Sequence, residues 1–334
     1  MRVTVIHNPN AGDDRQPTAG QIKALVKEAG YKVRFQSTSD PHWTRALEKS
    51  AAFVVVAGGD GTVGRVARRL IGRDMPIAVL PMGTANNISK TLGIVDLAVT
   101  QLIHSWRNAL RLKFDAGVAV GPWGERHFIE GIGTGLIPRS IPKLSRSKAL
   151  TQLSDADVKV AYAQQVIREH LEDSPPLAIE ATLDGIDISG QYLLFEVLNI
   201  QYVGPNLFLA PDIVRNNGEF EVILIREKHR AKLHRYLKNW QVGKMVPPAF
   251  ETHRGKRLEI NWTGFKLHID DQIWPVKGEK APTIPKIIDV AVVEKALQFL
   301  VPREVYEIQK RAKYNSEKAN KRESEKKGTR NPNR

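Results

Sequence analysis

FVVVAGGDGT, residues 53–62, decides the fold, because a continuous apolar run stops there at a glycine-rich turn. The run Phe53–Ala57 is typical of a strand that is buried on both faces of a parallel sheet. Behind the turn, apolar residues recur at helical spacing from Val63 to Ile71. Strand, turn and helix in this order predict an α/β domain with a parallel sheet.

Two further turns of this kind lie nearby in the sequence. VTVIH (Val3–His7) runs into the turn NPNAG (Asn8–Gly12). PIAVL (Pro76–Leu80) runs into the turn PMGTANN (Pro81–Asn87), which a short helix follows. In an open parallel sheet the ligand lies at the carboxyl ends of the strands, so all three turns are expected to face one site. Glycines and helix N-termini offer main-chain N–H groups to anions, and the sequence therefore predicts a phosphate-binding site.

The pattern of elements changes near residue 110. We expect residues 1–110 to form the α/β domain, with a Rossmann-like parallel sheet. Strand-like runs with Gly/Asn/Asp-rich connections predict a mainly antiparallel β-sandwich for residues 111–286. One long helical stretch, Asp155–Leu171, interrupts these runs. We expect residues 287–301 to return to the first domain, and residues 302–334 to form a basic, disordered tail.

Composition narrows the classes of function. The chain has a formal net charge of +14, which favours anionic partners such as nucleotides or an anionic lipid surface. Cysteine is absent, which excludes disulfides and thiol nucleophiles and fits a cytoplasmic location. No apolar stretch is long enough for a transmembrane helix. Specific nucleic-acid binding is the weakest candidate, because the basic tail carries only two aromatic residues, Tyr306 and Tyr314.

Asp60 is the candidate catalytic residue of the second turn. A carboxylate between glycines can accept a hydroxyl proton or hold a Mg²⁺-bound water during phosphoryl transfer. Asp is also a favoured N-cap, so Asp60 has an equally good structural interpretation as a cap of the next helix. The spacing alone leaves both interpretations open.

The paired motifs GGDGT (Gly58–Thr62) and PMGTANN resemble the signature of the diacylglycerol kinase catalytic-domain family, which includes sphingosine, ceramide and bacterial lipid kinases. NPNAG is similar to the first nucleotide-binding turn of that family. Two later segments, Gly204–Ile225 and Leu267–Pro275, resemble its proline–DG-turn segment and its late acidic motif. GGDGT also occurs in NAD kinases, but its PxGTxN partner and the β-rich second half favour the lipid branch.

The resemblance implies an NAD kinase/diacylglycerol kinase-like fold and an ATP- and Mg²⁺-dependent lipid kinase. Residues 1–110 would bind ATP, residues 111–286 would present a lipid hydroxyl, and the protein would work peripherally at an anionic membrane surface. A homodimer is left open. The residues expected to contact the nucleotide are Asn8, Asn10, Gly12, Gly58, Gly59, Gly61, Thr62, Gly83, Thr84 and Asn87.

The sequence departs from the family pattern at two acidic positions. Asn87 stands where PxGTxND usually ends in Asp. The late Asp-Gly-Glu motif reads Asp270-Asp271-Gln272, so Gln272 replaces a candidate base. Amides do not take up protons at neutral pH. We expect Asp60, Asp271 and Gln272 to form the catalytic group, with Asp271 or Asp270 in place of the missing carboxylate.

A third departure concerns metal binding. The DG turn, whose acidic residues hold a structural Mg²⁺ in some bacterial members, reads Asn217-Gly218. The resemblance assigns Asn217, Glu219 and Glu221 to that metal site. His127 and Glu130 lack an evident third ligand, so no metal site is expected there. Two alternatives to a lipid kinase remain: a nucleotide-binding regulator with impaired catalysis, and a kinase of a soluble hydroxylated substrate like the NAD kinases.

Overall fold

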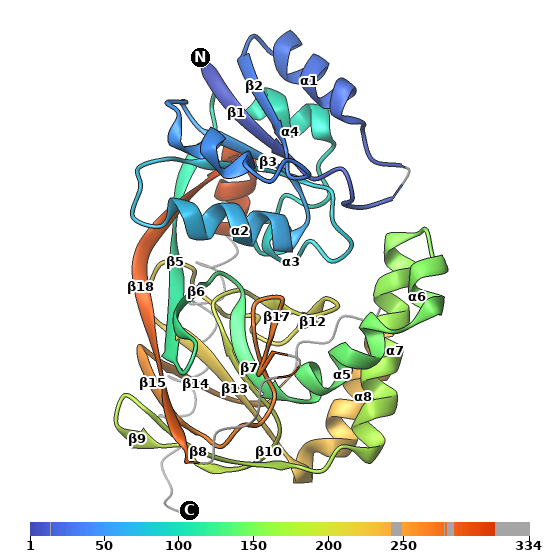
Figure 1. The fold of residues 1–334 in the computed structure, drawn as a ribbon, viewed down its shortest axis with the longest axis vertical. Coiled ribbons are helices and arrows are strands. Elements are labelled where there is room, and N and C mark those ends of the chain that lie inside the picture. The colour runs from blue at the N-terminus through green and yellow to red at the C-terminus, as the bar shows by residue number, and fades with distance from the viewer. Residues whose placement is uncertain (14, 242–248, 277, 279–283, 311–334) are drawn as a thin grey trace, which may run out of the picture.

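The computed structural model describes residues 1–13, 15–241, 249–276, 278 and 284–310. These residues form two domains, which lie one above the other in Figure 1. Two long neighbouring strands run from one domain into the other: β5 (Leu110–Gly121) and β18 (Lys286–Val301). The two domains therefore share a continuous sheet.

The first domain is built on a parallel sheet with strand order β18-β4-β3-β1-β2, as the sequence predicts. All five residues of β3 are buried, and α2 turns its apolar side towards the sheet while Arg65 and Arg69 are exposed. The elements are β1 (Arg2–His7), α1 (Ala19–Glu28), β2 (Lys32–Ser37), η1 (Trp43–Glu48), β3 (Val54–Gly58), α2 (Asp60–Leu70), β4 (Ile77–Pro81), α3 (Asn87–Thr91) and α4 (Val99–Ser105).

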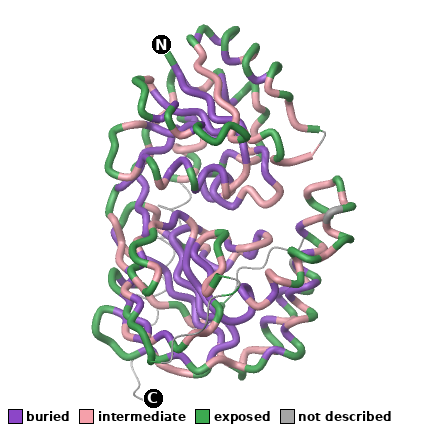
Figure 2. Tube along the Cα trace, viewed as in Figure 1, coloured by how far each residue is buried: buried purple, intermediate pink, exposed green. Residues whose placement is uncertain are grey.

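The second domain is a β-sandwich, and this expectation is also confirmed. One antiparallel sheet runs β6-β5-β18-β15-β8, and the other runs β17-β16-β7-β10-β13-β14. The strands are β6 (Gly124–Phe128), β7 (Gly131–Gly135), β8 (Leu177–Leu183), β9 (Ile186–Asp187), β10 (Gly190–Leu198), β11 (Tyr202–Val203), β12 (Leu207–Phe208), β13 (Phe220–Arg226), β14 (Glu251–Gly255), β15 (Arg257–Trp262), β16 (Leu267–Ile269) and β17 (Gln272–Trp274). Buried side chains from both sheets form one apolar core, visible as the buried interior of the lower half of Figure 2.

A group of helices covers the outer face of the second sheet, at the lower right of Figure 1. The helices are α5 (Leu136–Ser145), α6 (Lys148–Gln152), α7 (Ala156–Asp173) and α8 (Arg230–Gln241), with the short η2 (Glu227–His229) before α8. The sequence predicts a long helix from Asp155 to Leu171, which corresponds to α7, but it does not predict α5 and α6. Pro138 and Pro142 lie within α5 and obscure its helical pattern.

The end of the chain crosses back between the domains. β18 pairs with β15 in the sandwich, and its residue Phe299 pairs with Ile77 of β4 in the first domain. Residues 303–310 are helical, so the chain is ordered for some way beyond 302. The rest of the predicted basic tail, 311–334, lies outside the described residues. None of the helices in the described part of the chain is both long and apolar enough to span a bilayer.

Candidate active site

The second and third turns touch each other through their backbones. β3 and β4 are parallel neighbours that end in register at Gly58 and Pro81. A Cβ atom at Gly59 would lie 2.7 Å from Cα of Gly83, and one at Gly83 would lie 2.3 Å from Cα of Gly59. Real Cβ atoms do not approach other atoms this closely. Glycine is therefore required at both positions for the turns to meet.

The first turn joins the other two through polar contacts. Asn8 Nδ2 donates a hydrogen bond to Thr62 Oγ1 at 3.0 Å, and Asn8 Oδ1 accepts one from the main-chain N–H of Asn10 at 3.1 Å. Gly12 has a φ of 79°, and a Cβ there would lie 2.4 Å from the carbonyl oxygen of Met82. The structure thus brings together the three turns Asn8–Gly12, Gly58–Thr62 and Pro81–Asn87, called the phosphate turns below.

Asp60 caps a helix, but not the one that the sequence suggests. Its carboxylate accepts hydrogen bonds from the main-chain N–H groups of Asn87 and Ile88, both at 2.9 Å. Asp60 therefore caps α3, whereas the N-cap residue of its own helix α2 is Gly59. Burial raises the pKa of Asp60, although the two N–H donors and the nearby Lys90 ammonium oppose that shift. Asp60 links two phosphate turns while its carboxylate remains part of the site.

Asn87 connects the first domain to the second. Its side chain is buried, with 2% of the residue exposed. Nδ2 donates hydrogen bonds to Glu130 Oε2 at 3.2 Å and to the carbonyl oxygen of Gly204 at 2.9 Å. Among the described residues, no donor reaches Asn87 Oδ1. A buried acceptor without a partner is costly, so this oxygen indicates a place where a ligand group can donate.

Glu130 is a site residue that the sequence brings up only as a metal ligand, a role that is not expected for it. It lies between β6 and β7, is half-buried, and faces Asp60, Asp270 and Asp271. Burial raises the pKa of Glu130 well above its ordinary range, and the carboxylates of Asp60 and Asp270 add to the shift. No local pattern marks this residue, because its partners lie far away in the sequence. A glycine-rich strand, GIGTG, directly follows it and is the one available signal.

Asp270 and Asp271 are neighbours with different surroundings. The side chain of Asp270 is 4% exposed, accepts hydrogen bonds from the main-chain N–H groups of residues 129–131, and pairs with Arg68 of α2 at 2.5 Å. Burial raises the pKa of Asp270, with Arg68 opposing the shift. Asp271 is exposed, and a Cβ at Gly61 would lie 3.2 Å from its Oδ2. Asp270 is therefore a structural link between domains, whereas Asp271 is exposed beside the second phosphate turn.

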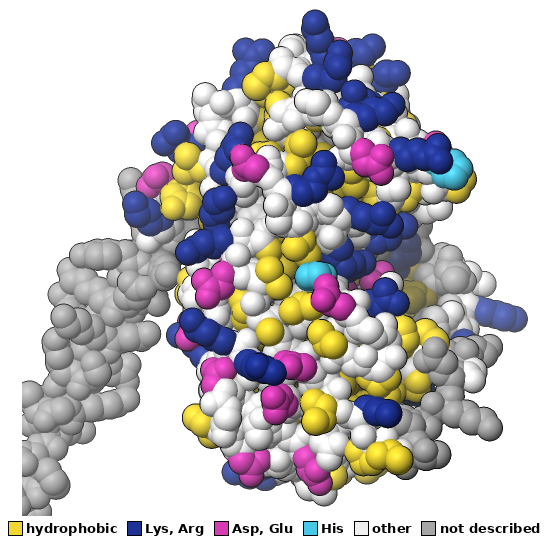
Figure 3. Space-filling model, turned by 60° about the vertical axis from the view of Figure 1, so that its left-hand side comes forward, with side chains coloured by type: hydrophobic (Ala, Val, Ile, Leu, Met, Phe, Trp, Pro, Cys, Tyr) yellow, Lys and Arg dark blue, Asp and Glu magenta, His cyan; other side chains and the backbone are white. Residues whose placement is uncertain are grey.

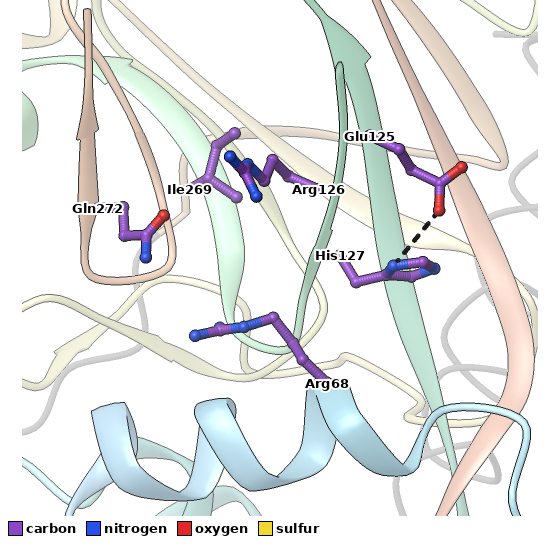
Figure 4. A pocket seen from close by; sticks show the side chains of 6 residues that line it. All are labelled: Arg68, Glu125, Arg126, His127, Ile269 and Gln272. Carbon is purple, nitrogen blue, oxygen red and sulfur yellow. Dashed lines mark ion pairs between the residues drawn. The ribbon is translucent and has the colours of Figure 1, made fainter. Parts of the chain in front are cut away.

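Gln272 lies in a separate polar pocket. A cavity of about 210 Å³ lies between α2, β6 and the β16–β17 hairpin. Figure 4 shows Arg68 reaching up from α2 towards the side chains of the two sandwich segments. The lining residues are Arg68, Glu125, Arg126, His127, Ile269 and Gln272. The other expected catalytic residues, Asp60 and Asp271, do not line this pocket.

The three residues expected to bind metal contact other side chains in the structure. Asn217 Nδ2 donates to Glu219 Oε2 at 3.3 Å, but Glu221 is paired with Arg254, whose Nη2 lies 2.9 Å from Oε1. Asp115 of β5 contacts this turn instead, and its Oδ2 accepts a hydrogen bond from the N–H of Gly218 at 2.8 Å. Within the part of the chain that the structure describes, no three acidic or histidine side chains gather as metal ligands.

An apolar cavity of about 420 Å³ lies beside the phosphate turns. One wall is formed by Thr84 and Ala85 of the third turn, and another by Gly204 and Pro205. The remaining walls are mostly aliphatic side chains of α5, α6 and α7, among them Ile137, Leu144, Leu150, Val160 and Ile167. The sequence does not predict this cavity, because α5 and α6 are not predicted.

This combination of an α/β domain with phosphate turns and a β-sandwich defines a class of two-domain kinases. Two family models match the chain: the diacylglycerol kinase catalytic domain over residues 2–119, and the YegS C-terminal NAD kinase β-sandwich-like domain over residues 146–301. The chain belongs to the bacterial diacylglycerol/lipid kinase family.

Curated relatives and a solved structure agree with this assignment. The chain is 27% identical over 242 residues to a diacylglycerol kinase of Bacillus subtilis, covering 70% of this chain and 77% of the relative. It is 25% identical over 318 residues to a diacylglycerol kinase of Mycobacterium tuberculosis, covering 90% and 96%. The fold resembles the crystal structure of a diacylglycerol kinase from Bacillus anthracis, with a TM-score of 0.66, 18% identity, and coverage of 91% and 98%.

Proposed function

We propose that the protein is an ATP-dependent lipid kinase that transfers the γ-phosphate to a hydroxyl of a diacylglycerol-like lipid. The observation that carries this proposal is the apolar cavity beside the phosphate turns. Thr84 and Ala85 belong both to a phosphate turn and to the cavity wall, so a chain in the cavity places its headgroup next to the phosphate site. A soluble polar acceptor has no use for an aliphatic cavity at this place.

The phosphate turns would bind the triphosphate of ATP through main-chain N–H groups at the start of α2. Mg²⁺ usually binds one or two carboxylates together with substrate phosphates. Asp271 fits that role because its carboxylate is exposed and borders Gly61. The ion would neutralise charge on the transferred phosphoryl group. Glu221 does not fit as a ligand, because its carboxylate is paired with Arg254.

The kinase would meet its lipid at an anionic membrane surface. α8 buries Leu233 and Leu237 and exposes Lys232, Arg235 and Lys238. Basic side chains also cover much of the upper part of the face in Figure 3, whereas basic and acidic ones mix lower down. Clustered Lys and Arg side chains are attracted to anionic lipids. This supports peripheral binding, and it leaves an ordinary solvated helix as the alternative for α8.

The main rival is a nucleotide-binding regulator. Its support is that two acidic positions of the family are amides here, Asn87 and Gln272. A regulator would bind ATP without turnover and would tolerate Asp60→Asn. A kinase of a soluble acceptor would turn over ATP, but its product would not be a lipid.

The test is phosphate transfer from γ-labelled ATP, with Mg²⁺, to mixed micelles that contain diacylglycerol or other lipid alcohols, and in parallel to NAD. We expect label in one lipid class and none in NAD. Asp60→Asn should reduce transfer by about 100-fold or more, as expected when a positioned charged group is lost. Asp187→Asn is the matched control, because Asp187 is an exposed carboxylate in a distant hairpin. ATP binding without label in any lipid would favour the regulator, and label in NAD would favour the soluble acceptor.

A further inference from the structure

Glu130 lies against the position where the family carboxylate is missing. Asn87 occupies that position, and its Nδ2 donates to Glu130 Oε2 at 3.2 Å. The two residues come from different domains, so this contact joins the phosphate turns to the sandwich. A carboxylate is therefore present next to residue 87, but it is supplied from the opposite side.

The backbone of Glu130 is fixed at this place from two directions. Its N–H donates to Asp270 Oδ1 at 2.8 Å, and its carbonyl oxygen accepts from the N–H of Asn199 at 2.9 Å. In the described part of the chain, its one side-chain hydrogen bond is the one from Asn87. The side chain is thus positioned but retains the capacity to accept another donor.

The other carboxylates of the site are more heavily engaged or placed elsewhere. Both oxygens of Asp60 accept main-chain N–H groups of α3. Asp270 is held by Arg68 and by residues 129–131. Asp271 is exposed beside Gly61, on the side of the phosphates. Glu130 is consequently the carboxylate that remains for the acceptor.

Glu130 also lies close to the apolar cavity. Asn87 Nδ2 donates both to Glu130 and to the carbonyl oxygen of Gly204, and Gly204 forms part of the cavity wall. Asn87 Oδ1, which no donor of the described residues reaches, is buried at the same junction. An unsatisfied acceptor and a carboxylate therefore lie together at the junction next to the cavity wall.

We propose that Glu130 is the catalytic base for the acceptor hydroxyl, and that it supplies from the second domain the carboxylate that the family has at position 87. This inference rests on the proposed lipid kinase function. In the step, the hydroxyl proton passes to the Glu130 carboxylate as the oxygen forms its bond to the γ-phosphorus. The bond from that phosphorus to the bridging oxygen breaks, and ADP leaves with the electron pair.

The electrostatic surroundings give Glu130 a higher proton affinity than a carboxylate has in water, which favours a general base. Burial raises the pKa of Glu130, and the carboxylates of Asp60, Asp270 and Asp271 contribute to the shift, while Asn87 opposes it. Arg68 and Lys90 are the cations that face this group through Asp270 and Asp60. The ionised form is the active one, so activity is expected to fall as pH drops through this raised pKa.

The experiment is a charge swap between positions 87 and 130, with lipid phosphorylation, ATP affinity and thermal unfolding measured for each variant. Glu130→Gln and Glu130→Asn should lower kcat by about 100-fold or more, the usual range for a general base. ATP affinity should stay within about threefold, because the phosphate turns are intact. The double variant Asn87→Asp with Glu130→Asn should recover at least about tenfold of the kcat lost in Glu130→Asn. Glu259→Gln is the control, because Glu259 is an exposed carboxylate of strand β15 and lines neither cavity of the site.

The outcomes separate this proposal from the proposed function. Transfer by the wild type together with near-normal kcat in Glu130→Gln would overturn the role of Glu130 and leave the kinase intact. If kcat falls in Glu130→Asn and does not recover in the double variant with Asn87→Asp, Glu130 does not replace the carboxylate of position 87. An inactive wild type would overturn the proposed function itself and, with it, the role of Glu130. Thermal unfolding provides an internal check. The pKa of Glu130 is raised in the folded protein, so its ionised form lowers stability at high pH. Glu130→Gln should therefore raise the Tm at pH 8 more than at pH 5.

Discussion

The phosphate turns and the acidic residues that face them meet at one place, but they are built in different ways. The turns are held by the backbone, through the contact between Gly59 and Gly83. The acidic residues are held by side chains from two domains, as in the contacts of Asp270 with Arg68 and with residues 129–131. Main-chain geometry depends on neighbouring residues in the sequence, whereas the side-chain contacts depend on the finished fold. The difference explains why one half of the site is visible in the sequence and the other half is not.

The largest expected effect is a loss of stability on replacing Asp270, which replacement of its neighbour Asp271 should not cause. Asp270→Ala leaves Arg68 without its partner and removes the acceptor of the buried N–H of Ile129. Loss of one partner from a buried charged pair costs about 3–5 kcal/mol. Asp271→Ala should change stability by less than about 0.5 kcal/mol, as expected for an exposed side chain, and should act on kcat instead.

Urea unfolding of the two variants checks this contrast, with activity measured on the same samples. Equal losses of stability would mean that Asp270 and Asp271 do not divide structure and chemistry between them.

The next effect tests the backbone contact of the turns. Gly59→Ala places a Cβ 2.7 Å from Cα of Gly83, so the two turns must separate. Overpacking of this kind costs about 1–3 kcal/mol, and ATP binding weakened by that amount would be about 5- to 150-fold weaker. Gly20→Ala is the matched control in α1, because the nearest atom to its new Cβ is 4.0 Å away. Titration with a fluorescent ATP analogue measures the affinity of both variants. An unchanged affinity in Gly59→Ala would show that ATP binding does not depend on the contact between Gly59 and Gly83.

The smallest effect concerns a buried pair beneath the acidic residues. His268 Nε2 lies 2.8 Å from Glu196 Oε2, and its Nδ1 donates to the carbonyl oxygen of Asp270 at 3.0 Å. Although burial opposes it, the Glu196 carboxylate raises the pKa of His268. Burial raises the pKa of Glu196, with His268 opposing the shift.

The sign of the resulting pH dependence follows from these directions. Both pKa values are higher in the folded protein, so the folded state binds more protons than the unfolded one in this range. The contribution to stability is therefore present at low pH and is lost as pH rises through the folded pKa of His268. The Tm of the wild type should fall between pH 6 and pH 9 relative to that of the double variant Glu196→Gln with His268→Gln. Parallel curves for the two proteins would show that the pair does not titrate.

Particular residues show which features the sequence alone predicts and which it does not. The run Phe53–Thr62 suffices for the α/β domain, because a buried strand and a glycine turn are local features. The role of Asp60 could not be decided, since it caps α3, whose first residue lies 27 positions away. The sequence could not place Glu130 in the site, because its partner Asn87 lies 43 positions away. The apolar cavity could not be expected, since the prolines of α5 hide a helix that forms its wall.

The most direct test of the central claim fills the apolar cavity. Ala163 of α7 lines it and is 9% exposed, so Ala163→Phe would occupy space that the proposed acyl chain needs. The measurement is kcat/KM for diacylglycerol phosphorylation in mixed micelles, with ATP affinity determined for the same protein. A lipid kinase that uses this cavity should lose at least about tenfold in kcat/KM and keep its ATP affinity, because one misfitted contact costs about 1–3 kcal/mol. Undiminished phosphorylation of diacylglycerol by Ala163→Phe would contradict the claim that the cavity holds the lipid.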